Sequence, residues 1–228
     1  MTSQTSQRIL VVAAHPDDEA LGCGGMMARH AAEGADVAVL FLADGEMART
    51  EAQSSLIGSR REAARRAAAE LGATSVTCSE FPDNRLDTVA ILDITQAIEA
   101  VIGAHKPSIL YTHHAGDVNV DHRIPHRAVM TACRALPGHP VRAIRCFEVL
   151  SSTEWATAGF GPPFRPTLFC DIATYMPTKL AALRCYDGEM RPFPHSRSYE
   201  AVEALAKYRG ASGGMLAAEG FVIARELL

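Results

Sequence analysis

The sequence predicts an α/β fold, a Rossmann-like three-layer sandwich around a mostly parallel central sheet, from three observations. Apolar runs of strand character alternate with helical segments. Polar clusters follow those runs at the points where the strands would end. The length of 228 residues, 48% of them hydrophobic, allows one full core. We therefore expect a single domain over 1–228, with 1–7 as a disordered tail.

The first half of the chain supplies the alternation of strands and helices. Its strands are apolar and rich in β-branched residues, and glycine or proline ends its helices. Strands are predicted at 8–12, 36–42, 75–78 and 108–112, and helices at 26–33, 60–71 and 89–102. Because strands joined through a helix pair in parallel, these elements predict a doubly wound sheet.

The second half is less regular but continues the pattern. Helices are predicted at 127–136, 177–186 and 199–210, and strands at 142–150 and, as an edge strand, at 167–172. The apolar segment 219–225 is expected to return to the core. Lys179 and Arg184, both in one predicted helix, are expected to be surface charges.

Composition and charge exclude several classes of function. The net charge of −4 offers no electrostatic basis for binding nucleic acid, and no apolar stretch is long enough for membrane insertion. The six cysteines form no C-x-x-C pair, which indicates reduced thiols and a cytoplasmic protein. No G-x-G-x-x-G motif follows the first predicted strand, so a dinucleotide cofactor is not expected.

A cluster of polar residues follows the first predicted strand. His15 and Asp18 are suitable ligands for a zinc-like ion, a few residues apart on a turn that Pro16 stiffens. Asp17 could act as a general base, and Glu19 could cap the next helix or support a ligand. The alternative interpretation is an acidic helix N-terminus without a metal.

A second cluster spans 113–126, directly after the fourth predicted strand. It gathers four histidines and two aspartates, although imidazoles buried without partners are costly. Since neighbouring parallel strands end at one edge of a sheet, the two clusters could together supply the three protein ligands of an open catalytic zinc site. His126, one helical turn after His122, could be a further ligand or could support the helix.

Four segments resemble the LmbE-like (PIG-L) family of zinc-dependent N-deacetylases: 14–19, 117–122, 195–198 and 209–221. The resemblance implies that His15, Asp18 and His122 bind one Zn²⁺ per chain, with another divalent ion such as Fe²⁺ as an alternative. It also implies that Asp17 is the general base.

Two further residues are expected to take part in catalysis. Several members of the family carry a histidine at the position of Asn119, where it serves as an acid or stabilises the oxyanion. That role would fall here to Asn119 itself or to His113 or His114. Asp121 is expected beside His122, where it would orient the imidazole ring.

The resemblance implies that the protein removes an N-acyl group, usually acetyl, from an amino sugar or a sugar conjugate. It also implies that the protein self-associates as a homo-oligomer. The alternative is a metal-dependent amidase acting on a non-sugar small amide or an acylated nucleoside. A binding protein with a degenerate site is disfavoured, because the four main site residues are all present. Substrate choice is expected to lie in the loops 45–58, 83–88, 151–166 and 187–198. The candidate substrate contacts are Glu46, Arg61, Asp83, Asn84, His113, His114 and Arg197.

Overall fold

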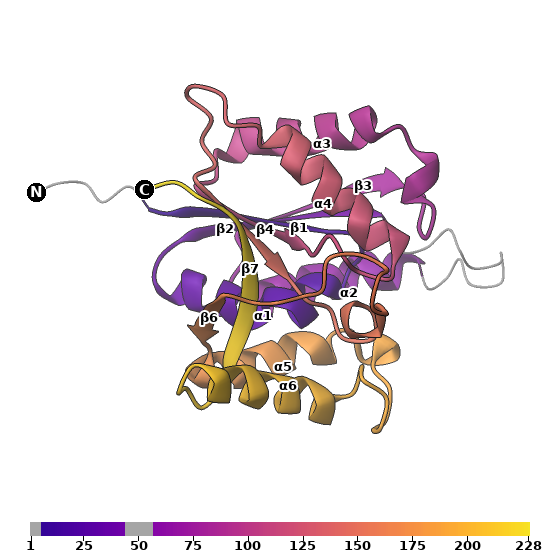
Figure 1. Cartoon of the computed structure of the whole chain (residues 1–228), viewed down its shortest axis with the longest axis vertical. Helices are drawn as coiled ribbons and strands as arrows, with labels where there is room; N and C mark the ends of the chain where they lie inside the picture. The colour runs from indigo at the N-terminus through magenta and orange to yellow at the C-terminus, as the bar shows by residue number, and fades with distance from the viewer. Residues whose placement is uncertain (1–5, 44–56) are drawn as a thin grey trace, which may run out of the picture.

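The computed structural model describes residues 6–43 and 57–228, apart from the side chains of 57–59. Within these residues, seven strands form one sheet with helices on both faces (Figure 1). The strands are β1 (Arg8–Ala13), β2 (Asp36–Ala43), β3 (Ser75–Phe81), β4 (Ile109–His113), β5 (Ala143–Phe147), β6 (Leu168–Asp171) and β7 (Ala218–Glu226). The helices are α1 (Asp18–Ala32), α2 (Ile57–Glu70), α3 (Ile91–His105), α4 (Val120–Ala132), α5 (Met176–Arg184) and α6 (Tyr199–Ser212). This arrangement confirms the predicted α/β class.

The strands follow the order β3-β2-β1-β4-β5-β7-β6 across the sheet. Strands β1 to β5 are parallel to one another, as the strand–helix alternation predicts. β7 runs antiparallel between β5 and β6. The C-terminal apolar segment therefore enters the sheet, and β6 takes the edge position that the sequence predicts.

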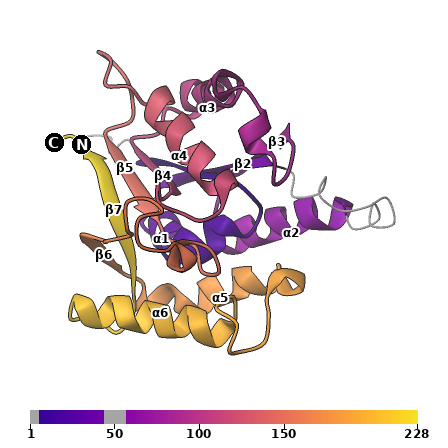
Figure 2. The ribbon, with the colours of Figure 1, turned by 45° about the vertical axis from the view of Figure 1, so that its right-hand side comes forward.

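Helices cover the sheet unequally (Figures 1 and 2). α3 and α4 lie on one face, and α1 and α2 on the other, with α5 and α6 stacked beyond them. Successive residues of β1 enter different cores: Ile9 packs with the α1 side, and Leu10 with the α3 and α4 side. Burial on both faces explains the continuous apolar strands of the sequence. Among the described helices, none combines the length and apolar character needed to cross a membrane.

α1 begins earlier than the sequence predicts and is kinked. Its first turn holds Asp18 and Glu19, whose charges suit the positive end of a helix dipole. The backbone leaves the helical conformation at Cys23 (φ −145°, ψ 21°). The glycines around it weaken the helical signal of the sequence, but they allow close packing on the sheet. A Cβ atom on Gly22 would overlap the ring of Phe147, so no larger residue fits there.

A buried ion pair holds the kink of α1. Lys179 Nζ donates to the carbonyl of Leu21 at 2.8 Å and to Glu219 Oε1 at 2.6 Å. The Glu219 carboxylate accepts from the backbone N–H groups of Gly25 (2.9 Å) and Met26 (2.8 Å). Backbone groups released by the kink are thus satisfied by side chains of α5 and β7. The prediction that Lys179 is a surface charge is wrong, because only 4% of the residue is exposed.

α4 begins at Val120, inside the second polar cluster. Asn119 caps it, since its side-chain Oδ1 accepts a hydrogen bond from the backbone N–H of Asp121 at 2.9 Å. Pro125 lies inside the helix, where it offers no N–H to the carbonyl of Asp121. His122 and His126 therefore belong to the helix and not to a loop before it.

Candidate metal centre

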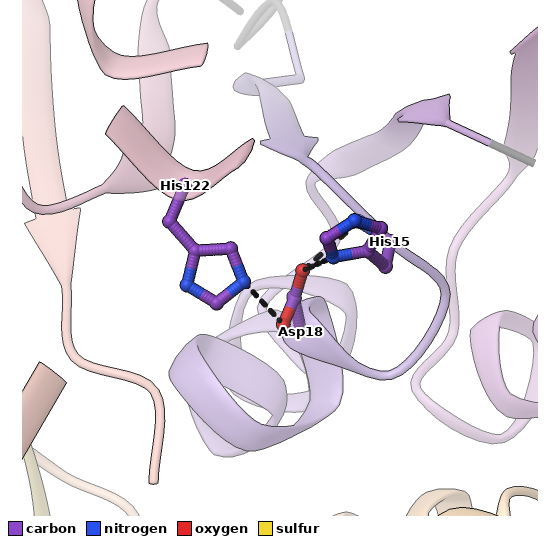
Figure 3. A group of neighbouring side chains, drawn as sticks. All are labelled: His15, Asp18 and His122. Atoms are coloured by element: carbon purple, nitrogen blue, oxygen red, sulfur yellow. Dashed lines mark hydrogen bonds and ion pairs between the residues drawn. The ribbon is translucent and has the colours of Figure 1, made fainter. Parts of the chain in front are cut away.

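The two polar clusters of the sequence meet at one edge of the sheet. β1 and β4 are parallel neighbours, with Ile9 opposite Ile109 and Val12 opposite Thr112. Their carboxyl ends therefore lie side by side, and the chain leaves them into α1 and toward α4. Figure 3 shows His15, Asp18 and His122 pointing toward one another from these segments. The strand topology thus brings together residues that lie more than a hundred positions apart.

The three side chains present donor atoms to a common centre. His15 Nδ1 lies 3.3 Å from Asp18 Oδ2, and His122 Nε2 lies 3.4 Å from Asp18 Oδ1 (Figure 3). One donor atom from each residue falls within 4.8 Å of the others, so the group could hold a metal ion. Asp18 Oδ1 is buried and has no hydrogen-bond partner in the described structure. An orphaned carboxylate oxygen between two imidazoles fits a cation that both imidazole and carboxylate would bind.

Carboxylates behind both rings fix their orientation. Asp121 Oδ2 and Asp83 Oδ1 each lie 3.1 Å from His15 Nε2, and a proton on that nitrogen accounts for both contacts. These three groups could also surround a cation. Asp117 Oδ2 lies 3.1 Å from His122 Nδ1. Carboxylates that hold the outer nitrogen of an imidazole leave the inner nitrogen free for a metal, a common arrangement in metal sites.

These contacts correct one expectation. Asp121 orients the ring of His15, and Asp117 is the carboxylate beside His122. The physical reason is the start of α4 at Val120: Asp121 and His122 are adjacent on a helix, so their side chains diverge. Asp117, in the loop before the helix, is the residue whose carboxylate reaches the ring.

The Asp117 carboxylate is itself held by residues that sequence reasoning missed. The hydroxyl of Thr153 donates to Oδ2 at 2.6 Å, and the hydroxyl of Ser152 donates to Oδ1. Burial acts against ionisation, but the contacts with His122 and the two hydroxyls lower the pKa of Asp117 to about 2. The sequence placed Asp117 in the second cluster without a role, and no signal marked Ser152 or Thr153.

Electrostatics favours positive charge at the centre. Burial acts to lower the pKa of both histidines, but neighbouring carboxylates outweigh it: the pKa of His15 is well above its usual range, and that of His122 is raised to about 9. Burial acts to raise the pKa of Asp18, yet His122 holds it well below its usual range. A divalent cation bound between these residues would supply the charge that the imidazole protons otherwise provide.

Asp17 lies beside the centre in a fixed, uncommon conformation. Its backbone is left-handed (φ 114°), and its N–H donates to Glu19 Oε2 at 3.0 Å. The hydroxyl of Tyr186 donates to Glu19 Oε1 at 2.7 Å, which anchors Glu19 in turn. Strained backbone of this kind persists only where surrounding contacts hold it. Glu19 therefore supports the backbone of Asp17 at the start of α1.

The Asp17 carboxylate has one engaged oxygen and one free oxygen. Arg197 Nη1 donates to Oδ2 at 2.8 Å, and Arg197 Nε donates to the hydroxyl of Ser151 at 3.0 Å. Oδ1 accepts no hydrogen bond from residues 6–43 or 57–228. Burial raises the pKa of Asp17 to about 6, although Arg197 acts in the opposite direction. Arg197, predicted as a substrate contact, is engaged here by Asp17.

Several other candidates lie away from the free space of the site. The ring of His113 is fully buried and stacks on the ring of His122, with the two centroids 4.1 Å apart. Its Nε2 accepts a hydrogen bond from the Ala14 N–H at 2.9 Å. Burial lowers its pKa to about 3, so the ring is neutral. Its 3.5 Å approach to Asp18 is therefore no ion pair. His114 Nε2 donates to the Pro162 carbonyl at 2.9 Å. Both imidazoles are used within the protein, which argues against contact with a substrate.

Asn119 and His126 have local roles in the structure. Asn119 uses its side-chain oxygen to cap α4, so only its amide N–H groups could serve as donors to a reacting carbonyl. His126 Nδ1 donates to the carbonyl of His113 at 3.0 Å. That bond ties α4 to His113, the last residue of β4 and the first of the second cluster.

The remaining candidates divide between the site and the surface. Asp83 is buried against His15, whereas Asn84 is exposed at a turn with φ 53°. Arg61 Nη2 lies 3.8 Å from a carboxylate oxygen of Glu80. The neighbouring Arg60 acts with Arg197, and less strongly, against the rise that burial causes in the pKa of Asp17. Glu46 lies outside the described residues.

The sequence is similar to those of known deacetylases. The family model PIG-L, described as GlcNAc-PI de-N-acetylase, matches residues 10–133, which include both clusters. A protein of Escherichia coli K12, the uncharacterized deacetylase YaiS, is 32% identical over 182 residues, covering 77% of this chain and 88% of its own. The diacetylchitobiose deacetylase of Thermococcus kodakarensis is 25% identical over 234 residues, which cover 94% of this chain and 82% of the deacetylase.

The fold also occurs with a different chemistry. The crystal structure of the 4-carboxy-2-hydroxymuconate hydratase of Pseudomonas putida KT2440 matches with a TM-score of 0.79 and 24% identity, covering 97% of this chain and 98% of the hydratase. A likeness at this identity shows the fold alone. The argument for function therefore depends on the family match and on the site.

Proposed function

Since this chain belongs to the PIG-L family of de-N-acetylases and is a deacetylase, we propose that it removes the acetyl group from the amine of an amino sugar or sugar conjugate. The chemistry named for its relatives supports this substrate class: the family model is described by a GlcNAc conjugate, and one relative acts on diacetylchitobiose. The convergence of His15, Asp18 and His122, with the orphaned Asp18 Oδ1 between them, is the observation that carries the proposal.

The three converging residues are the proposed holders of the metal ion. Zinc suits two imidazoles and one carboxylate with a position left open, and ferrous ion suits the same set. Such an ion, when bound, lowers the pKa of a water molecule and polarises the amide carbonyl. Asp121 and Asp117 keep the outer nitrogens of His15 and His122 engaged, so that the inner nitrogens face Asp18.

Asp17 is the proposed general base. Arg197 and the backbone contact with Glu19 hold the carboxylate in one position, with Oδ1 free. Oδ1 takes a proton as water adds to the amide carbon. The same oxygen returns that proton to the nitrogen as the C–N bond breaks, which leaves acetic acid and a free amine. The acid then gives its remaining proton to the amine or to water and leaves as acetate. Asp17 therefore ends the cycle in its starting ionisation state.

The first experiment measures metal and product together. Purified wild-type protein is expected to hold about one zinc or iron per chain, and His122→Ala is expected to lose it. His139→Ala is the matched control, because His139 bonds only to the Ala132 carbonyl and the Val141 N–H in the described structure. A metal content that His122→Ala leaves unchanged would refute the ligand set.

A panel of acetylated compounds then tests the substrate class. Amine release is measured from N-acetyl amino sugars, free and conjugated, and from small non-sugar acetamides. Release from the sugars alone supports the proposal. Release from the non-sugar amides alone, by a metal-loaded protein, would keep the deacetylase and reject the sugar.

A further inference from the structure

We propose that Trp155 and His195 form a stacking site for the sugar ring or other cyclic group that neighbours the acetylated sugar in a conjugate. This inference rests on the proposed function and extends it, since it assigns residues that choose a conjugate over a single sugar. The site lies on two loops where the sequence predicts substrate choice. The sequence alone left His195 open between a substrate contact and a structural hydrogen bond, and Trp155 was not a candidate contact.

Both loops meet at the proposed general base. Arg197 donates through Nη1 to Asp17 and through Nε to the hydroxyl of Ser151, so it joins the loop of His195 to the loop of Trp155. The two rings then meet with their centroids 5.9 Å apart and their planes at 76°. The aromatic pair thus adjoins the reacting position through one shared arginine, which is where the next ring of a conjugate would extend.

The loop of Trp155 is anchored to the metal centre. Glu154 accepts from the backbone N–H groups of Ser151 (2.6 Å) and Ser152 (3.2 Å). The Thr153 hydroxyl accepts from the N–H of Val149 at 2.8 Å and donates to Asp117. A turn with these bonds keeps the indole in a defined place relative to Asp117 and His122. Defined placement is what a binding ring needs, because less freedom is lost on binding.

Trp155 offers a large apolar surface that nothing in the described structure covers. About half of the residue (52%) is exposed. Two other exposed aromatic rings already carry a cation: Arg123 lies 4.9 Å from the centroid of Phe160, and Arg209 lies 5.4 Å from that of Tyr208. Trp155 has instead the ring of His195 at its side. An indole suits the C–H faces of a sugar ring, which are apolar while the hydroxyls at its rim are polar.

His195 supplies the polar partner of the site. Its Nδ1 accepts the backbone N–H of Arg197 at 3.0 Å, so the neutral ring carries its proton on Nε2. His195 is exposed, and Nε2–H is therefore a donor available to a ligand hydroxyl. An apolar ring surface with one fixed donor beside it is the usual composition of a small-molecule site.

The test uses the fact that Trp155 is the only tryptophan in the sequence. The fluorescence of the metal-loaded protein is titrated with the fully deacetylated disaccharide of glucosamine, which cannot react, and with glucosamine alone. We expect a saturable change with the disaccharide and little change with the single sugar. No change with the disaccharide, up to concentrations that inhibit the enzyme, would overturn the proposal.

Kinetics provide the second arm. Trp155→Ala is expected to lower kcat/KM for N,N′-diacetylchitobiose about tenfold, mainly through a higher KM. For N-acetylglucosamine, kcat/KM should stay within about twofold of the wild-type value. A tenfold loss corresponds to about 1.4 kcal/mol. Trp155→Phe should recover part of the loss, because a flat ring remains. Tyr208→Ala, which removes an even more exposed ring on α6, is the control and should change kcat/KM for neither substrate.

The two arms separate this inference from the proposed function. An equal loss on both substrates would make Trp155 a structural residue and reject the stacking site. If the wild-type protein releases amine from neither sugar but its fluorescence follows the disaccharide, the stacking site stands and the proposed substrate class fails. If neither signal is seen, both are rejected.

Discussion

Replacing Lys179 with methionine should strongly destabilise the protein. The substitution keeps the length and apolar stem of the side chain but removes Nζ, which bonds both Leu21 and Glu219 in the interior. It leaves a buried carboxylate with two N–H donors and no cation. Breaking a buried ion pair from one side costs about 3–5 kcal/mol of the free energy of unfolding. In a chain of this length that corresponds to a fall in Tm of roughly 10 °C.

The assay is urea denaturation followed by circular dichroism, with Lys207→Met as the matched control. Lys207 Nζ lies 3.5 Å from Glu203, but its side chain is 71% exposed, and such pairs contribute about 0–1 kcal/mol. Adding Glu219→Gln to Lys179→Met should recover part of the loss, because it removes the stranded charge and keeps an oxygen acceptor for the N–H groups of α1. A Lys179→Met variant as stable as Lys207→Met would refute the reasoning.

Three further predictions concern the base, the metal and the pH dependence of stability. Asp17→Asn should lower amine release at least about a hundredfold with unchanged metal content, and turnover within a few fold of wild type would reject Asp17 as the base. Asp117→Ala should weaken metal binding about 10–100-fold in competition with a chromogenic chelator, whereas Asp87→Ala should not alter it. Burial lowers the pKa of His30 to about 4, from the ordinary value of 6.5 for a histidine. As pH falls, the unfolded chain therefore binds the proton before the folded chain does. The contribution of neutral His30 to the free energy of unfolding is complete above pH 6.5 and is lost as pH falls toward 4. His30→Gln should flatten the stability profile in that window, measured by urea denaturation at each pH; a slope equal to wild type would contradict the assignment.

The sequence predicted the sheet well because local pattern determines its strands. β1 and β2 are buried on both faces, so their apolar runs are continuous and their positions are clear. The start of α1 was missed by eight residues because its first turn holds two acidic residues and its second turn is rich in glycine. The start of α4 was expected within the second cluster, but its exact residue was not, because that segment is rich in polar groups. In both helices the start places site residues on a helix, which changes the direction in which each side chain points.

Long-range contacts explain what the sequence could not reveal about the site. His15, Asp18 and His122 could be grouped because each follows a strand, and neighbouring parallel strands end together. No local signal connects Arg197 with Asp17, since the two are 180 positions apart and meet only through the folded loops. The same holds for Lys179, whose burial depends on a carboxylate 40 positions later.

The place of Glu219 has a consequence for how the protein is made. The kinked helix that begins with Asp18 leaves the ribosome well before β7, yet the carboxylate that accepts from its Gly25 and Met26 N–H groups lies on β7. Until that strand inserts between β5 and β6, a nascent chain holds Lys179 without its counter-ion and an open β5 edge. The contacts that support the kink beside the candidate metal centre are therefore completed only when β7 docks, and a chain stalled before residue 219 should depend on chaperones.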